Sequence, residues 1–146
     1  ISEEMEKDLL YVMGPGTTTA SIMEYLGLEN TLLGIDAIRN RESVSNDVGE
    51  RELMDLVTNY ATKIVVSVIG GQGYILGRGN QQLSPQVVSK VGRDNFMVVA
   101  SKGKLASLGG RPLLVDTGDD ALDDSLSGYW KVLTGYREYV MYIAGQ

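Results

Sequence analysis

Short apolar runs, each closed by glycine or a polar turn, dominate the pattern of the chain. Runs of Val, Ile and Leu bounded by turn residues predict buried strands, and continuous runs are typical of strands covered on both faces, as in parallel sheets. We expect strands at Leu9–Met13, Thr31–Ile35, Ile64–Ile69, Phe96–Ala100 and Leu113–Val115.

Helical patterns alternate with these runs. Apolar residues recur at helical spacing over Thr17–Leu26, and Gly27 stands where a helix C-terminal cap is expected. Asp47 followed by Glu50 resembles a capping box, which predicts a helix over Gly49–Tyr60.

Three further elements are predicted in the second half of the chain. A serine cap and a first-turn proline predict a helix over Ser84–Val91, ended by Gly92. The acidic run Asp119–Asp124 is typical of a helix N-terminus, which favours negative charge, rather than of a metal site. Trp130–Thr134 and Tyr139–Ile143 are expected to pair as a closing hairpin.

The alternation of strands and helices determines the expected fold. It implies right-handed crossovers and a layered arrangement of helices on a sheet. We therefore expect an α/β fold: a three-layer Rossmann-like domain with a mostly parallel sheet and a C-terminal β-hairpin. Neither a repeat nor a linker is visible, so residues 1–146 are expected to form a single α/β domain.

Composition excludes several functions. The chain has no cysteine and no histidine, which rules out disulfides, thiolate zinc sites, cysteine nucleophiles and His-assisted hydrolysis. A net charge of −6 with scattered basic residues argues against a nucleic-acid partner. No apolar run approaches a membrane span and no signal peptide is visible, so we expect no membrane contact and a cytoplasmic location. The start at Ile1 suggests a segment cut from a longer protein or a proteolytic product.

The sharpest local feature is a strand followed by a glycine turn and a helix start. Glycine allows a ligand to approach the backbone closely, and the free amides and dipole of the first helical turn favour an anion. Neither the Walker pattern nor the dinucleotide fingerprint fits. We expect a phosphate site here, and the alternative is a tight turn that only caps a helix. The candidate residues are Gly14, Gly16, Thr17, Thr18 and Thr19.

A second glycine-rich string follows the most apolar strand candidate. Open α/β sheets place ligands at such positions, and arginine and carboxamide side chains suit phosphate, ribose or base edges. A flexible surface loop is the alternative. The candidates are Gly70, Gly71, Gln72, Gly73, Arg78, Gly79, Asn80, Gln81 and Gln82.

Isolated charged residues complete the set of candidates. Lys102 and Lys104 follow a strand and could neutralise a phosphate, although solvated lysines are equally consistent with this position. Asp36 and Asp116 each end a predicted strand and could act as a base or hold Mg²⁺, but such turns are common. We predict no dedicated metal site. The clustered C-terminal tyrosines favour packing or a homo-oligomer interface, with base stacking as the second possibility.

Several strings resemble a known family. They are Gly14–Thr19, Gly70–Pro85, Arg111–Asp119 and Thr134–Glu138. Together they are similar to the C-terminal part of the ATP-NAD kinase-like proteins, also called predicted polyphosphate/ATP-NAD kinases, over essentially the whole chain. The resemblance implies a nucleotide-binding domain of a kinase (a transferase of NADP biosynthesis) that phosphorylates NAD, using ATP or polyphosphate with Mg²⁺.

The chain differs from the family at the catalytic motif. The family's catalytic Gly-Gly-Asp-Gly motif lies in an N-terminal domain, and here Gly70–Gly73 has glutamine at the aspartate position. We therefore identify no catalytic residue and expect the catalytic N-terminal domain to be missing, so that the chain alone is inactive. Classical NAD kinases carry an all-β second domain, but the predicted caps and the alternation argue against one here.

Two other functions stay open. The strand, the Gly14–Thr19 turn and the helix are also similar to sugar-phosphate isomerases and phosphosugar sensor domains, in which case Asp36 or Asp116 would be the candidate base. The aromatic tail could instead make the chain a non-catalytic dimerisation module.

Overall fold

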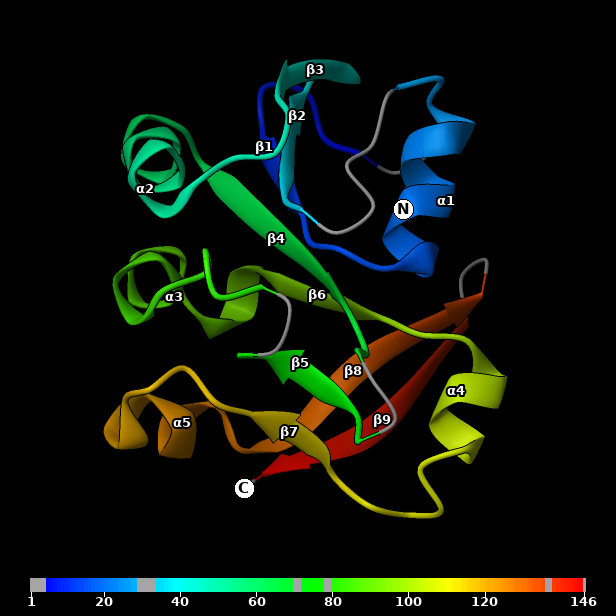
Figure 1. Cartoon of the computed structure of the whole chain (residues 1–146). Coiled ribbons are helices and arrows are strands. Elements are labelled where there is room, and N and C mark those ends of the chain that lie inside the picture. The colour runs from blue at the N-terminus through cyan, green and yellow to red at the C-terminus, as the bar shows by residue number, and fades with distance from the viewer. Residues whose placement is uncertain (1–4, 29–33, 70–71, 78–79, 136–137, 146) are drawn as a thin grey trace.

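A computed structural model describes residues 5–28, 34–69, 72–77, 80–135 and 138–145 (Figure 1). In chain order the elements are β1 (Leu10–Met13), α1 (Thr17–Tyr25), β2 (Asp36–Arg39), β3 (Glu42–Ser45), α2 (Glu50–Asn59), β4 (Thr62–Ser67), β5 (Tyr74–Leu76), α3 (Pro85–Val91), the 3-10 turn η2 (Arg93–Asn95), β6 (Phe96–Val99), α4 (Lys102–Ala106), β7 (Leu113–Val115), α5 (Asp120–Leu126), β8 (Gly128–Gly135) and β9 (Glu138–Gly145).

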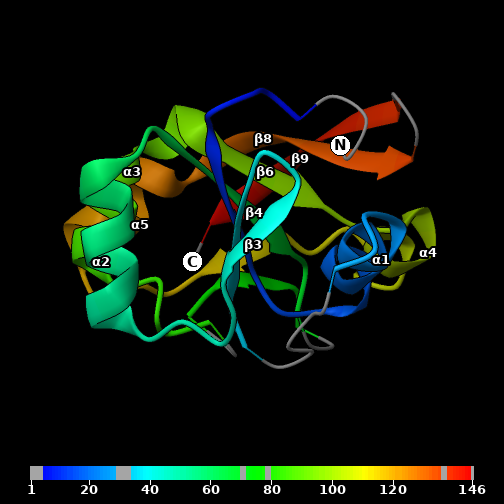
Figure 2. The same cartoon turned by 90° about the horizontal axis from the view of Figure 1, so that it is seen from above.

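The strands of the described residues form one nine-stranded sheet in the order β3-β2-β1-β4-β6-β8-β9-β7-β5. Strands β1, β4, β6 and β8 are parallel to one another, and β9 returns antiparallel to β8. Strands β7 and β5 then run parallel to β9. Helices α2, α3 and α5 cover one face, and α1 covers the other with α4 beside it (Figure 1, Figure 2). The predicted three-layer α/β fold with a mostly parallel sheet is confirmed.

The two faces of the sheet bury two separate cores. The larger core joins β1, β4, β6 and β8 to α2, α3 and α5, and β5 and β7 add Ile75 and Leu113 to it. The smaller core lies under α1, where Met23 packs with Met13, Val65 and Val99. Alternate residues of each parallel strand point to opposite cores, so both faces are apolar, as in the buried strands of parallel sheets.

The helix signals were confirmed except at one cap. The Ser84 hydroxyl accepts a hydrogen bond from the Val87 amide, and Gly92 ends α3 with a φ of 86°. The capping box at Asp47 is wrong: Gly49 caps α2 without a side-chain hydrogen bond. Asp47 has a φ of 52°, and its amide donates to Asp36 Oδ1 at 2.9 Å, so it belongs to a turn before the helix.

The predicted strand Thr31–Ile35 is misplaced. Its first three residues lie outside the described residues, and the strand β2 begins only at Asp36. Asp36 therefore starts a strand and does not end one. The hairpin β2–β3 was not predicted, because its residues are mixed in polarity and β3 lies exposed at the edge of the sheet.

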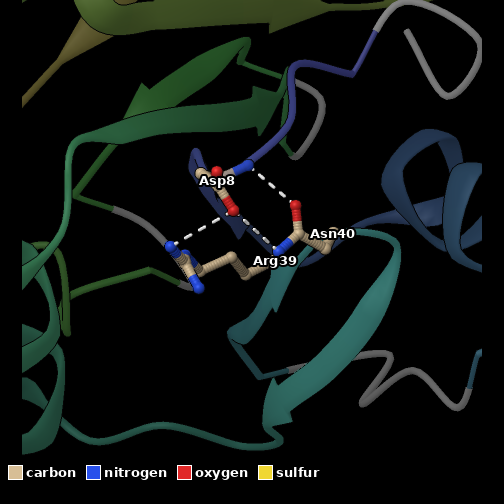
Figure 3. A network of polar contacts seen from close by, with 3 residues as sticks. All are labelled: Asp8, Arg39 and Asn40. Carbon is tan, nitrogen blue, oxygen red and sulfur yellow. Dashed lines mark hydrogen bonds and ion pairs between the residues drawn. The ribbon is translucent and has the colours of Figure 1, made fainter.

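A polar network fixes the segment before β1 to this hairpin (Figure 3). The Asp8 amide donates to Asn40 Oδ1 at 2.7 Å, and Asn40 Nδ2 donates to Asp8 Oδ1 at 3.1 Å. Arg39 Nη2 lies 3.5 Å from the same carboxylate oxygen. Asn40 and Arg41 both have positive φ, as two-residue hairpin turns require.

Among the helices of the described ranges, none combines the length and the hydropathy of a membrane-crossing segment.

Candidate functional site

The carboxyl ends of the parallel strands meet at one edge of the sheet. Ser67 of β4 pairs with Val99 of β6, and Val99 pairs with Leu133 of β8. Strand β1 ends beside them at Met13, whose register partner in β4 is Val65. In open α/β sheets this edge is where ligands bind.

The turn from β1 to α1 lies directly against β4. The Gly14 amide donates to the Val65 carbonyl at 2.8 Å. Gly16 has a φ of 126°, and a β-carbon at this position would lie 3.0 Å from both Cβ and Oγ of Ser67. Glycine at position 16 is therefore required both by its backbone conformation and by the close approach of β4.

Helix α1 begins at this turn with amide donors that no side chain of the described residues caps. The first helical bond runs from the Ala20 amide to the Gly16 carbonyl, and Gly16 supplies no side-chain cap. The amides of Thr17, Thr18 and Thr19 precede that bond, so they have no partner within the helix and favour an anion. The Thr19 hydroxyl donates to the Gly14 carbonyl at 2.6 Å, so this side chain holds the turn together.

A pocket of about 270 Å³ lies beside the first turns of α1. Its lining residues are Thr18, Ile22, Val99, Ala100, Ser101, Leu133, Thr134 and Gly135. Thr134 Oγ1 is buried and has no hydrogen-bond partner among the described residues. The same holds for Ser67 Oγ at the end of β4, which is separated from β8 by β6. Buried hydroxyls are normally paired, so these two hydroxyls at one edge of the sheet are available to bind a ligand.

Charged residues adjoin two residues of the pocket lining: Lys102 follows Ser101 in the chain, and Glu138 pairs with Gly135. Ser101 caps α4 by accepting the Lys104 amide at 3.0 Å. Lys102 Nζ lies 2.8 Å from Glu138 Oε2 of β9, so this ion pair joins α4 to the hairpin. The hydrogen bond and the charge of Lys102 lower the pKa of Glu138 below its usual value. Lys104 is half-buried on the same short helix.

The second glycine-rich string does not form one loop. Strand β5 occupies its middle and runs antiparallel to β4, because β5 and β7 are parallel to β9. Gly73 before β5 consequently lies at the pocket end of the sheet, and Gly77 after β5 lies at the opposite end. The glycines on the two sides of β5 therefore do not belong to one loop.

Asn80 is held inside the structure. Its side chain is fully buried, its Oδ1 accepts from the Gly77 amide at 2.9 Å, and its Nδ2 donates to the Ile75 carbonyl at 3.0 Å. Both ends of the amide therefore fix the turn after β5. Gln72 and Gln81 are exposed and Gln82 is half-buried. Gly70, Gly71, Arg78 and Gly79 lie outside the described residues.

The two candidate carboxylates lie at opposite ends of the sheet. Asp36 pairs with Met13, so it lies at the same end of the sheet as the pocket, buried, with Oδ1 accepting the Asp47 amide. Asp116 is exposed at the far end, where its amide donates to the Leu76 carbonyl at 3.1 Å. Within the part of the chain that the structure describes, no three acidic residues gather to hold a metal ion.

Comparison with known proteins identifies the family of this chain. The profile described as the ATP-NAD kinase C-terminal domain matches residues 6–143. The chain belongs to this family. The resemblance inferred from the sequence strings is thereby confirmed. No curated protein and no solved structure matched the chain.

Within this kinase domain, sequence reasoning missed Ser67 and Thr134. Ser67 interrupts an otherwise apolar strand at its carboxyl end, and Thr134 precedes the glycine of the final hairpin. A polar residue where a buried strand ends was the available signal. Nothing in the sequence showed that β4 and β8 would end at the same edge of the sheet.

Proposed function

We propose that the pocket beside α1 binds the phosphate end of a nucleotide for an NAD kinase that converts NAD to NADP. ATP or polyphosphate would be the phosphoryl donor, and an N-terminal domain would supply the catalytic residues. The observation that carries the proposal is the pair of orphan hydroxyls, Ser67 and Thr134, beside an uncapped helix N-terminus.

The chemistry of the pocket suits a phosphate group. Free amides of the first turn of α1 and the positive end of its dipole favour an anion. The Thr134 hydroxyl in the pocket lining and the Ser67 hydroxyl under the turn at Gly16 add neutral donors, and Lys102 can exchange Glu138 for a phosphate oxygen. The described residues do not fit a protein-held Mg²⁺, so no step is assigned to that ion.

The size of the pocket limits what it holds. A volume of about 270 Å³ is slightly below that of small-molecule sites, which span about 300–1,000 Å³. It suits a phosphate with its ribose, while the remainder of a dinucleotide would lie outside. The same size also suits a sugar phosphate, which keeps a phosphosugar-binding domain as the second candidate function.

Two conservative variants test the site. Ser67→Ala and Thr134→Val each remove an orphan hydroxyl, so the unliganded protein should keep or slightly gain stability, because no hydrogen bond is lost. Binding of NAD, NADP, ATP or polyphosphate, measured by calorimetry and thermal shift, should weaken about tenfold in each variant, as expected when about 1.4 kcal/mol of hydrogen bonding is lost.

A surface variant provides the control. Ser43→Ala removes an exposed hydroxyl on β3, whose partner is Asn46 Oδ1, and should leave binding unchanged. Equal nucleotide affinity in wild type, Ser67→Ala and Thr134→Val would refute the site. A shift with ribose or glucosamine phosphates but none with nucleotides would favour the phosphosugar function.

A further inference from the structure

A pocket of about 270 Å³ lies at the amino end of β1, where Leu10 pairs with Arg39 of the β2–β3 hairpin. The pocket beside α1 lies where the parallel strands end, so the two pockets are at opposite ends of the sheet. The segment before β1 and the turn of the β2–β3 hairpin line this pocket, which we call the amino-end pocket. The lining residues that determine its chemistry are Glu6, Lys7, Tyr11, Ile38, Arg39 and Arg41.

The buried part of this lining is apolar. Ile38 is fully buried and Tyr11 is 4% exposed, and both belong to the smaller core. Met5, which also lines the pocket, packs against the same core. These residues offer a ligand an apolar surface that the core already holds in place.

The rest of the lining is mostly cationic. Lys7, Arg39 and Arg41 contribute three positive charges and Glu6 contributes one negative charge, which leaves an excess of two positive charges. The whole chain has a net charge of −6, so this pocket is opposite in sign to the protein that carries it. Cations gathered around one pocket raise the local concentration of anions.

The guanidinium of Arg39 is only partly satisfied. Nη2 lies 3.5 Å from Asp8 Oδ1, which is longer than the about 2.7–2.9 Å of a strong charge-assisted hydrogen bond (Figure 3). The same Asp8 oxygen also accepts from Asn40 Nδ2. Arg39 Nε is buried without a hydrogen-bond partner in the part of the chain that the structure describes. This group therefore keeps donors for a further oxyanion.

Tyr11 adds a neutral donor to the pocket. Its hydroxyl accepts a hydrogen bond from the Glu6 amide at 2.9 Å, and its own hydrogen has no acceptor among the described residues. Burial raises the pKa of Tyr11 above its ordinary value of 10.0, so the hydroxyl keeps that hydrogen at neutral pH. An oxygen of a bound ligand can accept it.

We propose that the amino-end pocket binds a small phosphate monoester with an apolar body. Such a group carries about −1.5 to −2 charges at pH 7, which matches the excess of positive charge in the lining. Guanidinium groups bind phosphate oxygens with paired donors, and the apolar residues receive the body of the ligand. A volume of about 270 Å³ suits a compact ligand, because drug-sized molecules occupy about 300–1,000 Å³.

The test is an NMR titration of the 146-residue chain with phenyl phosphate, followed at the backbone amides of Lys7, Tyr11 and Arg41. The shifts should saturate with a dissociation constant of about 1 mM, the range of a weak small-molecule site. Inorganic phosphate lacks the apolar body and should bind about tenfold more weakly. Benzoate has one charge fewer and should bind about threefold more weakly, and neutral phenol should give no saturable shift.

Charge variants test the cationic lining. Lys7→Gln and Arg41→Gln each remove one exposed cation and should weaken binding of phenyl phosphate about threefold, with about a tenfold loss in the double variant. Arg51→Gln removes an exposed cation from α2 and should bind as wild type. Thr134→Val alters the pocket beside α1 and should leave the affinity of the amino-end pocket unchanged, which separates this proposal from the nucleotide site.

Three outcomes would overturn the proposal. The first is the absence of shifts at these amides with phenyl phosphate at about 10 mM, or shifts confined to Thr18 and Ser101 of the other pocket. The second is equal affinity for phenyl phosphate and inorganic phosphate, because the apolar residues would then contribute nothing. The third is wild-type affinity in the double variant of Lys7 and Arg41, because the cations would then not hold the phosphate.

Discussion

Gly16 is the position at which a single methyl group should disturb the site most directly. Its φ of 126° and ψ of 165° lie in a region that is essentially restricted to glycine, where other residues incur about 1–3 kcal/mol of strain. The added β-carbon would also lie 3.0 Å from Ser67, so Ser67 must move by a few tenths of an ångström, which costs about 1 kcal/mol, the low end for overpacking. Gly16→Ala should therefore lower the free energy of unfolding by about 2–4 kcal/mol.

The assay is urea unfolding followed by the fluorescence of Trp130, the only tryptophan in the chain. A parallel thermal scan should show a melting temperature lower by roughly 5–15 °C for a chain of this length. Gly103→Ala is the matched control, because Gly103 lies within α4 with open space around it. It should gain about 0.5–1 kcal/mol from better helix propensity.

A double-mutant cycle separates the cost of the backbone strain at position 16 from the cost of the contact with Ser67. Ser67→Gly removes both atoms that the new β-carbon would meet, so Gly16→Ala should cost about 1 kcal/mol less in that background. A cost below 0.5 kcal/mol for Gly16→Ala, or identical costs in the two backgrounds, would show that the turn does not press on β4 as described.

Three other predictions concern groups away from the pocket beside α1. Asn80→Ala should lower the free energy of unfolding by about 2–4 kcal/mol, because it leaves an amide and a carbonyl unpaired in the interior; denaturation by urea measures this, and a loss below 1 kcal/mol would contradict it. Arg93→Lys should cost about 1–2 kcal/mol and shift tryptophan emission, since a lysine cannot hold several carbonyls while stacking 4.2 Å above Trp130; an unchanged spectrum and stability would count against it. Burial raises the pKa of Tyr11 above 10.0, so its unfolded form ionises first and stability should fall as the pH rises past 10. Tyr11→Phe, which loses the bond from the Glu6 amide, should flatten that alkaline decline, and equal slopes would refute the assignment.

The sequence located most elements that carry a strong local signal. The helix over Pro85–Val91 was predictable because Ser84, Pro85 and Gly92 determine its ends locally. The buried strands were predictable because long runs of Val and Ile have few other stable environments. The capping box at Asp47 failed, since the same residue types also form turns, and a bond to Asp36, eleven positions away, decided between the two.

The candidate site was only partly predictable, because part of it depends on contacts between residues far apart in the sequence. The Gly14–Thr19 turn was recognisable because a strand, a glycine turn and a helix start are local features. The pairing of Ser67 with Val99 and the position of Thr134 depend on which strands become neighbours, and that order is determined by long-range packing. Strand β5 within the string from Gly70 to Gln82 was not predicted, because three apolar residues are too few to reveal a strand.

By itself the sequence determined the α/β class, the kinase family and the turn at α1, because each rests on residues that are close together in the chain. Only the tertiary structure decided that Asn80 is internal and that Asp36 and Asp116 lie at opposite ends of the sheet. It also decided that Tyr129 and Met141 of the β8–β9 hairpin are exposed. These properties depend on the direction of each strand and on how much of the sheet a helix covers. Both are determined by contacts between residues that lie far apart in the sequence.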